Sequence, residues 1–422
     1  MRTLYICLGY CLAPFAFALA LWRALGSGGD WRALGERFGF GAAPPPGALW
    51  LHAVSVGEVQ LAAALVRELR RSDPGRALLV TTSTMTGRQR ALEALGAGVA
   101  VRYLPFDLPG AVARFLDRCR PAQGLVLETE LWPNLYLACH RRGIPLLIAN
   151  ARLSQRSLRG YRLARGLMRA TLEGVSVAAQ SAEDAARFRA LGADPARVVE
   201  AGNLKFDVVL PPTVERDGAA LRAAIGAARP VWVAGSTHAG EEEQLLEAHR
   251  RLRQSHAAAL LVLAPRHPPR FAEVAALLER RGIAFQRRTD RRAPAAAAEV
   301  LLLDTLGELV AFYAAGDVAF VGGSLVPVGG HNLLEPAALG RALVSGPATF
   351  NAPAVARLLV ASGALAIVAD ATGLAVRLEE LIADPAARAR AGEAGRAVVA
   401  ANRGAIARVL SLAARLAPPA TT

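Results

Sequence analysis

The stretch ALWLHAVSVGEVQ, residues 48–60, decides the fold, because it joins a strand pattern directly to a helix pattern. The apolar run ALWLHAVS (48–55) predicts a buried strand, and a helix is expected to start at Gly57. A near-continuous apolar strand followed at once by a helix is typical of a parallel sheet with both faces covered. The fold therefore depends on whether this unit repeats.

The unit does repeat, in two series. The first series of predicted strands is 48–55, 77–84, 99–106, 124–130, 145–152, 174–180 and 197–205. Helical patterns between them, such as RQRALEALG and AEDAARFRALG, each end on a glycine. The second series is 230–237, 259–266, 298–305, 318–324, 341–347 and 365–370.

Between the two series, DVVLPPTVERDG (207–218) has prolines and charges but no hydrophobic period, and it is predicted to be a linker. We expect an α/β protein with two doubly wound Rossmann-like domains facing a cleft. The first would cover residues 23–210 and the second residues 211–422. The last helices are candidates to pack back on the first domain.

Length and composition agree with two folded domains. A chain of 422 residues is too long for one ordinary core, and 53% hydrophobic with 20% charged residues indicates a folded protein. The formal net charge of +14 calls for an anionic partner: nucleic acid, anionic lipid or a phosphorylated small molecule. Nucleic acid is disfavoured, because the chain has no basic block, zinc-finger spacing or RNP-like cluster. Four cysteines without a CxxC pair indicate free thiols in a reducing compartment.

The N-terminus contains an uncharged stretch, TLYICLGYCLAPFAFALALW (3–22). As a helix it would span roughly 30 Å, about one hydrocarbon core. A membrane anchor, a cleaved signal peptide and a buried helix all fit that length. Arginines follow the stretch, as expected for a cytoplasmic flank, so we predict a membrane anchor over residues 1–22 with the rest of the chain in the cytosol. Gly9 and Pro14 leave room for a helix that lies in the membrane interface instead.

One basic residue stands apart from the others. Lys205, in GNLKFD (202–207), is the only lysine among 49 lysine and arginine residues. A compact, flexible ammonium can do what a planar guanidinium cannot, although chance explains a single lysine about as well. Lys205 is expected at the end of a strand, just before the linker, and would there line the cleft between the domains.

Carboxylates follow two strands of the first series. Ser55 and Glu58 fit a capping box, but Gly57 before the carboxylate also allows close approach of a ligand, so Glu58 is a candidate general base. Glu128 and Glu130 come at the end of the strand 124–130. Glu130 is expected mainly to act on the helix dipole.

Glu128 is flanked by apolar residues and is expected to be buried. A buried carboxylate needs a cation or hydrogen-bond donors. Lys205 or Arg152 could supply them.

The second series also carries polar strand ends. GSTHAGEEE (235–243) offers backbone N–H groups to an anion, and its acidic run is expected to act on the helix dipole. Arg266 in LAPRHPPRF suits a phosphate oxygen, with a structural salt bridge as the alternative. Thr305 and Glu308 match a second capping box.

The glycine-rich stretch FVGGSLVPVGGHNLLEPAALG (320–340) leads into a helix. Its glycines allow close approach of a ligand, and Glu335 could accept hydrogen bonds from ribose hydroxyls. Neither series has GxGxxG after its first strand, which argues against a dinucleotide enzyme. The sole lysine is not in GxxxxGK[ST], which excludes a Walker P-loop.

Taken in order, these motifs resemble the 3-deoxy-D-manno-octulosonic acid (Kdo) transferases. The resemblance runs from WRALGERFGF (31–40) to about residue 400 through HAVSVGE, ETELWPNL, IANARLS, GNLKFD, STHAGEE, PRHP, GEL and FVGGSLVPVGGHNLLEP. It implies a GT-B glycosyltransferase of lipopolysaccharide biosynthesis, held at the bacterial inner membrane by its N-terminus, with cytoplasmic catalytic domains. Such an enzyme transfers Kdo from CMP-Kdo to the lipid A precursor lipid IVA with inversion, without a cofactor or an active-site metal.

The resemblance also implies roles for individual residues. Glu58 would be the base for the acceptor hydroxyl, and Glu128 and Lys205 would stabilise the transition state. The first domain would then bind the acceptor and the second CMP-Kdo. The CMP site would comprise Pro265, Arg266, Leu306, Gly307, Glu308, Asn332, Leu333, Leu334 and Glu335.

Some details and alternatives remain open. Position 306 is leucine where relatives often have methionine, so a contact there through the backbone is more secure than one through the side chain. The basic composition suits a bis-phosphorylated lipid and an anionic membrane surface. The alternatives are a GT-B enzyme for another nucleotide sugar and a non-catalytic, membrane-anchored nucleotide-sugar binding protein.

Overall fold

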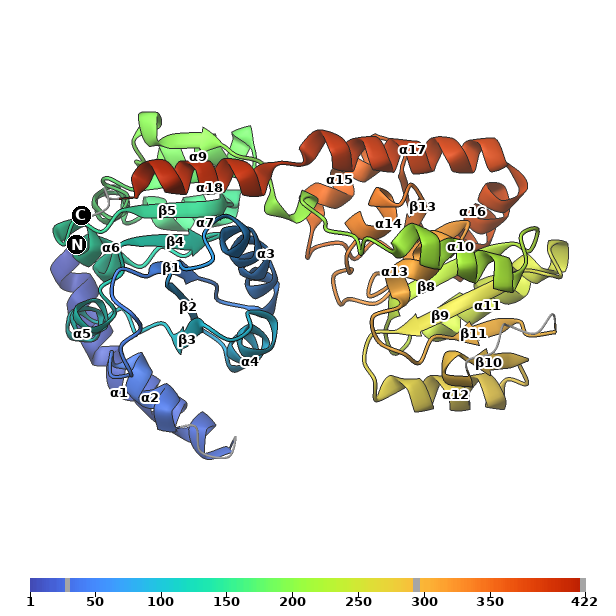
Figure 1. Ribbon diagram of the computed structural model, residues 1–422, viewed down its shortest axis with the longest axis horizontal. Helices are drawn as coiled ribbons and strands as arrows, with labels where there is room; N and C mark the ends of the chain where they lie inside the picture. The colour runs from blue at the N-terminus through green and yellow to red at the C-terminus, as the bar shows by residue number, and fades with distance from the viewer. Residues whose placement is uncertain (27–30, 291–296, 418–422) are drawn as a thin grey trace. The chain divides into compact units, whose positions relative to one another are not determined.

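The computed structural model describes residues 1–26, 31–290 and 297–417, and the chain divides into two compact units (Figure 1). Unit 1 consists of Met1–Asp207 together with Gly404–Thr422, and unit 2 of Val208–Arg403. Each unit is built around a parallel sheet with helices on both faces, so the expectation of two parallel α/β domains is confirmed.

The sheet of unit 1 has the strand order β3-β2-β1-β4-β5-β6-β7 within the described residues. Its strands are β1 (Leu49–His52), β2 (Leu78–Thr82), β3 (Val99–Tyr103), β4 (Gln123–Leu127), β5 (Leu146–Ala151), β6 (Ser176–Ala179) and β7 (Val198–Glu200). Its helices are α1 (Arg2–Gly26), α2 (Trp31–Arg37), α3 (Val56–Ser72), α4 (Met85–Ala94), α5 (Pro109–Cys119), α6 (Pro133–Arg141), α7 (Gln155–Arg162), α8 (Arg165–Thr171), α9 (Ala182–Leu191) and α18 (Ala405–Leu416), with 3-10 turns η1 (Pro195–Arg197) and η2 (Leu204–Phe206).

The sheet of unit 2 has the order β10-β11-β9-β8-β12-β13-β14. Its strands are β8 (Val231–Thr237), β9 (Leu260–Pro265), β10 (Phe285–Arg287), β11 (Val300–Leu302), β12 (Val318–Val321), β13 (Ala342–Ser345) and β14 (Leu365–Ile367). Its helices are α10 (Val214–Ile225), α11 (Glu242–Ser255), α12 (Arg270–Arg280), α13 (Leu309–Ala315), α14 (Leu334–Ala338), α15 (Pro353–Ala361), α16 (Ala371–Ala383) and α17 (Pro385–Asn402), with the 3-10 turn η3 (Arg288–Asp290).

Side chains along β1 point alternately to the two faces of the sheet, which explains why continuous apolar runs form parallel strands. Trp50 packs into the core on one face of the sheet, and Leu49 and Leu51 pack into the core on the other. All three side chains are at most 1% exposed. Because helices cover each face of the sheet, residues at both odd and even positions along the strand must be apolar. Complete burial of one such side chain stabilises the fold by about 2 kcal/mol.

Three predicted boundaries need correction. The strand expected over 197–205 ends at Glu200, so Lys205 lies on η2 and not at a strand end. The predicted linker 207–218 runs into α10, which begins at Val214 with acidic residues in its first turn. The edge strand β10 was not predicted, because its three residues, FQR, carry little apolar pattern.

The end of the GNLKFD stretch connects to the C-terminal helix of unit 1. The Asp207 carboxylate accepts hydrogen bonds from the backbone N–H groups of Gly404 and Ile406, where α18 begins. An acceptor at this position satisfies N–H groups that have no partner inside the helix. Asp207 therefore ties the segment that carries Lys205 to α18.

Within the described residues, one helical stretch is long and apolar enough to cross a membrane by length and composition, Pro385–Leu416. It comprises α17 and α18, which are interrupted at Gly404, where φ is +89°. Ala405 and Val409 of α18 are fully buried in the core of unit 1, as expected for a core helix.

The membrane-spanning anchor predicted for residues 1–22 is not supported. The hydroxyl group of Tyr5 in α1 donates to Asp107 at 2.9 Å, and α1 runs beside α5 in Figure 1. One side of α1 is therefore occupied by contacts with unit 1.

Candidate active site

Glu58 lies in the first turn of α3, directly after β1. Its Oε2 accepts a hydrogen bond from the Val54 N–H at 2.7 Å, and its Oε1 accepts one from the Ser55 hydroxyl at 3.1 Å. Burial raises the pKa of this carboxyl to about 7, against the bond from Val54, and the charges of Glu128 and Glu130 add to the rise. A carboxyl group with a pKa near neutrality can accept a proton from a hydroxyl group and release it again.

The predicted capping box at this helix is not formed. Ser55 is the N-cap of α3, but its side chain accepts no hydrogen bond from the helix backbone. It donates instead to Glu58, whose other oxygen binds the N–H of Val54, one residue before the cap. The contacts therefore hold the Glu58 carboxyl in place more than they cap the helix.

Glu128 follows β4 in the left-handed region of backbone space, with φ of +58°. That conformation is costly for a residue other than glycine, and such strain often occurs at functional sites. Its side chain is half-buried, and no ion pair with Lys205 or Arg152 is found within the described residues. The expected buried ion pair is therefore wrong. The charge of Glu128 acts instead on Glu58 and Glu130.

Asn150 is a residue that the sequence reasoning missed. It is fully buried near the end of β5 with φ of +56°, and its Oδ1 accepts the N–H of Leu204 at 3.0 Å. Because Leu127 and Ala149 are register partners, Asn150 and Glu128 follow them on neighbouring strands, both in the left-handed region. Asparagine in an otherwise apolar strand, PLLIANAR, was the available signal.

Two asparagines thus fix the turn that carries Lys205. Asn150 holds the backbone of Leu204, and the Oδ1 of Asn203 accepts the N–H of Lys205 at 3.0 Å. The Lys205 side chain is half-buried and has no ion pair among the residues that the structure describes. The turn is rigidly placed, while its ammonium group is left for another partner.

In unit 2, Arg266 follows β9 and its side chain is exposed. Its backbone N–H donates to Thr237 at 3.0 Å, and no ion pair of its guanidinium is found in the described part of the chain. The alternative interpretation of Arg266, a structural salt bridge, is therefore not found among the described residues. Pro265, the last residue of β9, is buried, so only its backbone is available to a ligand.

Asn332 and Glu335 lie around the start of α14. Asn332 accepts the N–H of Leu334 at 3.0 Å. Burial raises the pKa of Glu335, while a hydrogen bond with Asn332 and the charge of Arg266 oppose that rise. The structure therefore brings Arg266, Asn332 and Glu335 together. Leu333 and Leu334 are buried and can offer a ligand only their backbones.

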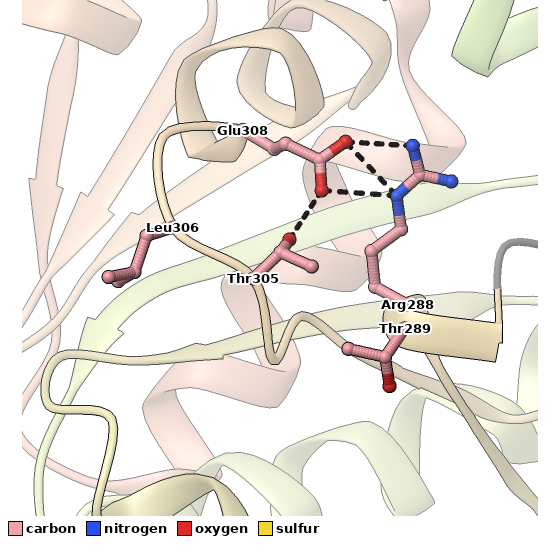
Figure 2. Close-up of a pocket in the computed structure, with 5 residues that line it drawn as sticks. All are labelled: Arg288, Thr289, Thr305, Leu306 and Glu308. Atoms are coloured by element: carbon pink, nitrogen blue, oxygen red, sulfur yellow. Dashed lines mark hydrogen bonds and ion pairs between the residues drawn. The ribbon is translucent and has the colours of Figure 1, made fainter.

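The segment Leu306–Glu308 borders a pocket of about 590 Å³ (Figure 2). The Glu308 carboxylate accepts bonds from the Arg288 Nη2 at 2.7 Å and Nε at 3.2 Å, and from the Thr305 hydroxyl. Arg288 lowers the pKa of Glu308 more than any other group. Figure 2 shows Leu306, 71% exposed, pointing away from this ion pair.

The second predicted capping box is also wrong, since Thr305 donates to Glu308 and caps no backbone N–H, while α13 begins only at Leu309. Arg288 was not predicted, because it lies 20 residues before its partner. Gly307 has φ of +85°, a conformation that glycine adopts at no cost.

Glu241 organises the glycine-rich loop after β12. It is fully buried, and its carboxylate accepts the backbone N–H groups of His238, Gly323, Ser324 and Leu325 at 3.3, 2.7, 3.0 and 2.9 Å. The acidic run 241–243 was expected to act mostly on the helix dipole; Glu241, the N-cap residue of α11, in addition binds four backbone N–H groups. A buried carboxylate with four donors fastens the loop to the start of α11.

The chain is similar to several known proteins. Residues 32–208 match the family described as 3-Deoxy-D-manno-octulosonic-acid transferase (kdotransferase). The chain is 41% identical over 384 residues to 3-deoxy-D-manno-octulosonic acid transferase of Haemophilus influenzae, with 90% of each protein covered. It is 41% identical over 415 residues to the protein of that name from Bordetella pertussis, covering 94% of this chain and 95% of the relative.

Solved structures show a similar fold. UDP-GlcNAc 2-epimerase from Neisseria meningitidis bound to UDP-GlcNAc has a TM-score of 0.59 at 14% identity, covering 87% of this chain and all of that one. A glycosyltransferase from Rickettsia africae has a TM-score of 0.55 at 13% identity, covering 87% of this chain and 97% of that one. At such low identity the likeness concerns the fold alone.

Proposed function

The chain belongs to the 3-deoxy-D-manno-octulosonic acid (Kdo) transferase family, and we propose that it transfers Kdo from CMP-Kdo to a hydroxyl group of lipid IVA, with inversion, in lipopolysaccharide biosynthesis. Relatives 41% identical over nine-tenths of the chain support the reaction class. The observation that carries the proposal is the Glu58 carboxyl, buried in the first turn of α3, with a pKa raised to about 7.

Unit 1 would supply the base. The Glu58 carboxylate takes the proton of the acceptor hydroxyl, the acceptor oxygen bonds to the anomeric carbon, and the bond from that carbon to the phosphate oxygen breaks. The electron pair of the broken bond leaves with CMP. The Lys205 ammonium group, which has no ion partner among the described residues, would stabilise the negative charge that develops in the transition state, and Glu128 its positive charge.

Unit 2 would hold the nucleotide. The Arg266 guanidinium has no ion pair among the described residues and is available to the phosphate, and Glu335 with Asn332 offers acceptors to ribose hydroxyls. Pro265, Leu333 and Leu334 would contribute backbone groups, because their side chains are buried. Three further residues would act through the loop that they form, Leu306, Gly307 and Glu308, since the Glu308 carboxylate is already bound by Arg288.

The N-terminal helix would place the enzyme on the cytoplasmic face of the inner membrane. Leu4, Leu8, Leu12 and Phe15 are exposed, and their spacing puts them on one side of α1. Because a neighbouring side of the helix contacts unit 1 through Tyr5, we infer that α1 lies in the interface and does not cross the bilayer. Leu8→Glu should then reduce binding to anionic lipid vesicles in a flotation assay, and unchanged binding would contradict this orientation.

The reaction is tested by measuring Kdo transfer from freshly generated CMP-Kdo to lipid IVA. Glu58→Gln keeps the shape of the side chain but cannot accept the proton, so we expect a loss of about 10²–10⁴-fold in turnover. Glu68→Gln, on an exposed part of the same helix, is the matched control and should retain activity.

Other outcomes separate the alternatives. Transfer from a different nucleotide sugar, but not from CMP-Kdo, would identify another glycosyltransferase. CMP binding without any turnover, insensitive to Glu58, would indicate a non-catalytic binding protein.

A further inference from the structure

Two histidines of unit 2 are joined by one hydrogen bond. His238 follows β8, and His331 lies in the loop after β12, the neighbouring strand. Their Nε2 atoms are 2.7 Å apart, the ring planes differ by 2°, and the ring centroids are 5.0 Å apart. Since 2.7 Å is closer than two rings can lie face to face, the rings must be coplanar and meet edge to edge.

This bond determines where the remaining protons can be. A neutral imidazole has one N–H, so one ring donates its Nε2–H and has a bare Nδ1, while the other accepts at Nε2 and has an Nδ1–H. One added proton, on the bare Nδ1, gives the pair two Nδ1–H donors and a charge of +1 without breaking the bond. Neither Nδ1 has a hydrogen-bond partner among the described residues, and both rings are partly exposed.

The surroundings of the pair are dominated by positive charge. The charged or titratable groups that act on it are Arg266, His267, Arg270 and Glu241. Burial lowers the pKa of both imidazoles, that of His331 to about 4, and the neighbouring cations lower it further. The one opposing carboxylate, Glu241, is already bound by four backbone N–H groups. A bound anion would reverse this balance.

We propose that the His238–His331 pair binds the phosphate group of the CMP moiety and takes up one proton from solvent as it does so. The inference rests on the proposed function, because the pair lies close to Arg266, which is assigned there to the nucleotide. The two Nδ1 atoms lie at opposite ends of the edge-to-edge pair, so one Nδ1–H group faces the phosphate, and this donor with one positive charge suits a phosphate oxygen. When the anomeric bond breaks, the electron pair stays on that phosphate, and the charged pair stabilises it. The proton returns to solvent when CMP leaves.

Calorimetric titration of the full-length protein with CMP, in buffers of different ionisation enthalpy, measures the proton directly. At about pH 7.5 the free CMP phosphate is already mostly a dianion, so it needs no proton of its own. We expect the wild type to take up about one proton per CMP, with an affinity that falls as the pH rises. His331→Gln and His238→Gln should abolish the uptake and weaken CMP binding about tenfold, which is 1.4 kcal/mol.

Two control measurements test whether the proton uptake depends on the phosphate and on this histidine pair. Cytidine, which lacks the phosphate, should bind without proton uptake and equally well to the wild type and to His331→Gln. His267→Gln, whose ring contacts His238 without a hydrogen bond, should retain the uptake.

The inference is overturned if the wild type binds CMP without proton uptake, or if uptake persists in both variants. It is also overturned if His331→Gln weakens cytidine as much as CMP, because the pair would then act on the shape of the loop. If the folded wild type binds no CMP at all, the proposed function fails together with the inference.

Discussion

Glu241 in unit 2 and Lys205 in unit 1 both lie in loops that follow parallel strands, but their surroundings differ. The Glu241 carboxylate is fully buried and receives four backbone N–H groups. The Lys205 ammonium is half-buried and has no ion partner in the described part of the chain, although the backbone around it is fixed by Asn150 and Asn203. The charge of Glu241 therefore holds its loop together, whereas the loop around Lys205 holds an ammonium group that is left without an ion partner.

The same contrast extends to neighbouring groups. In unit 2, Glu308 is bound by Arg288, and the buried Glu242 is paired with Arg270 at 3.0 Å. In unit 1, the buried Nδ2 of Asn150 has no partner, and Glu128 has no ion pair among the described residues. An unsatisfied buried donor costs about 1–3 kcal/mol. Such a cost is typical of a site arranged for a ligand.

Among the tests of this contrast, the substitution of Lys205 is expected to have the largest effect on turnover. Lys205→Arg keeps the charge but replaces a compact ammonium with a planar group, so it should lower Kdo turnover by about 10²-fold while the thermal unfolding of the protein stays unchanged. Arg152→Lys, the reverse exchange at the residue that follows β5, should leave turnover unchanged. Full activity of Lys205→Arg in the transfer assay would show that the lone lysine has no special role.

A smaller loss of activity is expected from Asn150→Gly. Glycine adopts the left-handed backbone conformation without strain, so the substitution removes the bond to Leu204 and leaves a small cavity in place of the buried side chain. We expect turnover to fall about tenfold, corresponding to the roughly 1.4 kcal/mol of a hydrogen bond that positions Lys205. KM for CMP-Kdo should not change. A rise in KM with constant kcat would instead place Asn150 in substrate binding.

Glu241→Gln tests the other half of the comparison. A glutamine cannot accept all four N–H groups, so unit 2 should lose about 3 kcal/mol of stability, and hydrogen exchange over residues 320–331 should accelerate. Glu247→Gln, which removes only surface pairs of α11, should cost less than about 1 kcal/mol. If both variants exchange alike, Glu241 does not fasten the loop.

Local patterns were sufficient to predict the sheets. Every strand of both sheets except β10 falls within a predicted apolar run or, for β4, begins one residue before it, because burial on both faces requires continuous apolar sequence. Glu58 was identified in the same way, as a carboxylate just after such a run. The signals fail where local pattern is weak, as in the three residues of β10 and in the turn that takes Lys205 beyond β7.

Contacts between distant segments could not be predicted in this way. Three of the four donors to Glu241 lie 82–84 residues after it, His331 lies 93 residues after His238, and Arg288 lies 20 residues before Glu308. A motif such as S-x-x-E or T-x-x-E suggests a helix cap, but Glu58 binds the local groups of Ser55 and Val54 without forming a capping box, and Glu308 is bound by the more distant Arg288. Which charges are paired, and which are left for a ligand, is a property of the assembled strand ends.

The raised pKa of Glu58 has a consequence for stability that is separate from catalysis. Between its unfolded value of about 4.5 and its folded value of about 7, the folded chain holds a proton that the unfolded chain has lost. The contribution of Glu58 is therefore fully present below pH 4.5 and is lost as the pH rises through 7. Glu58→Gln, which cannot ionise, should unfold about 2–4 °C above the wild type at pH 8, with the difference shrinking as the pH falls towards 5. Thermal unfolding followed by circular dichroism across this range measures the effect, and a constant difference would mean that the Glu58 carboxyl is not strained by burial.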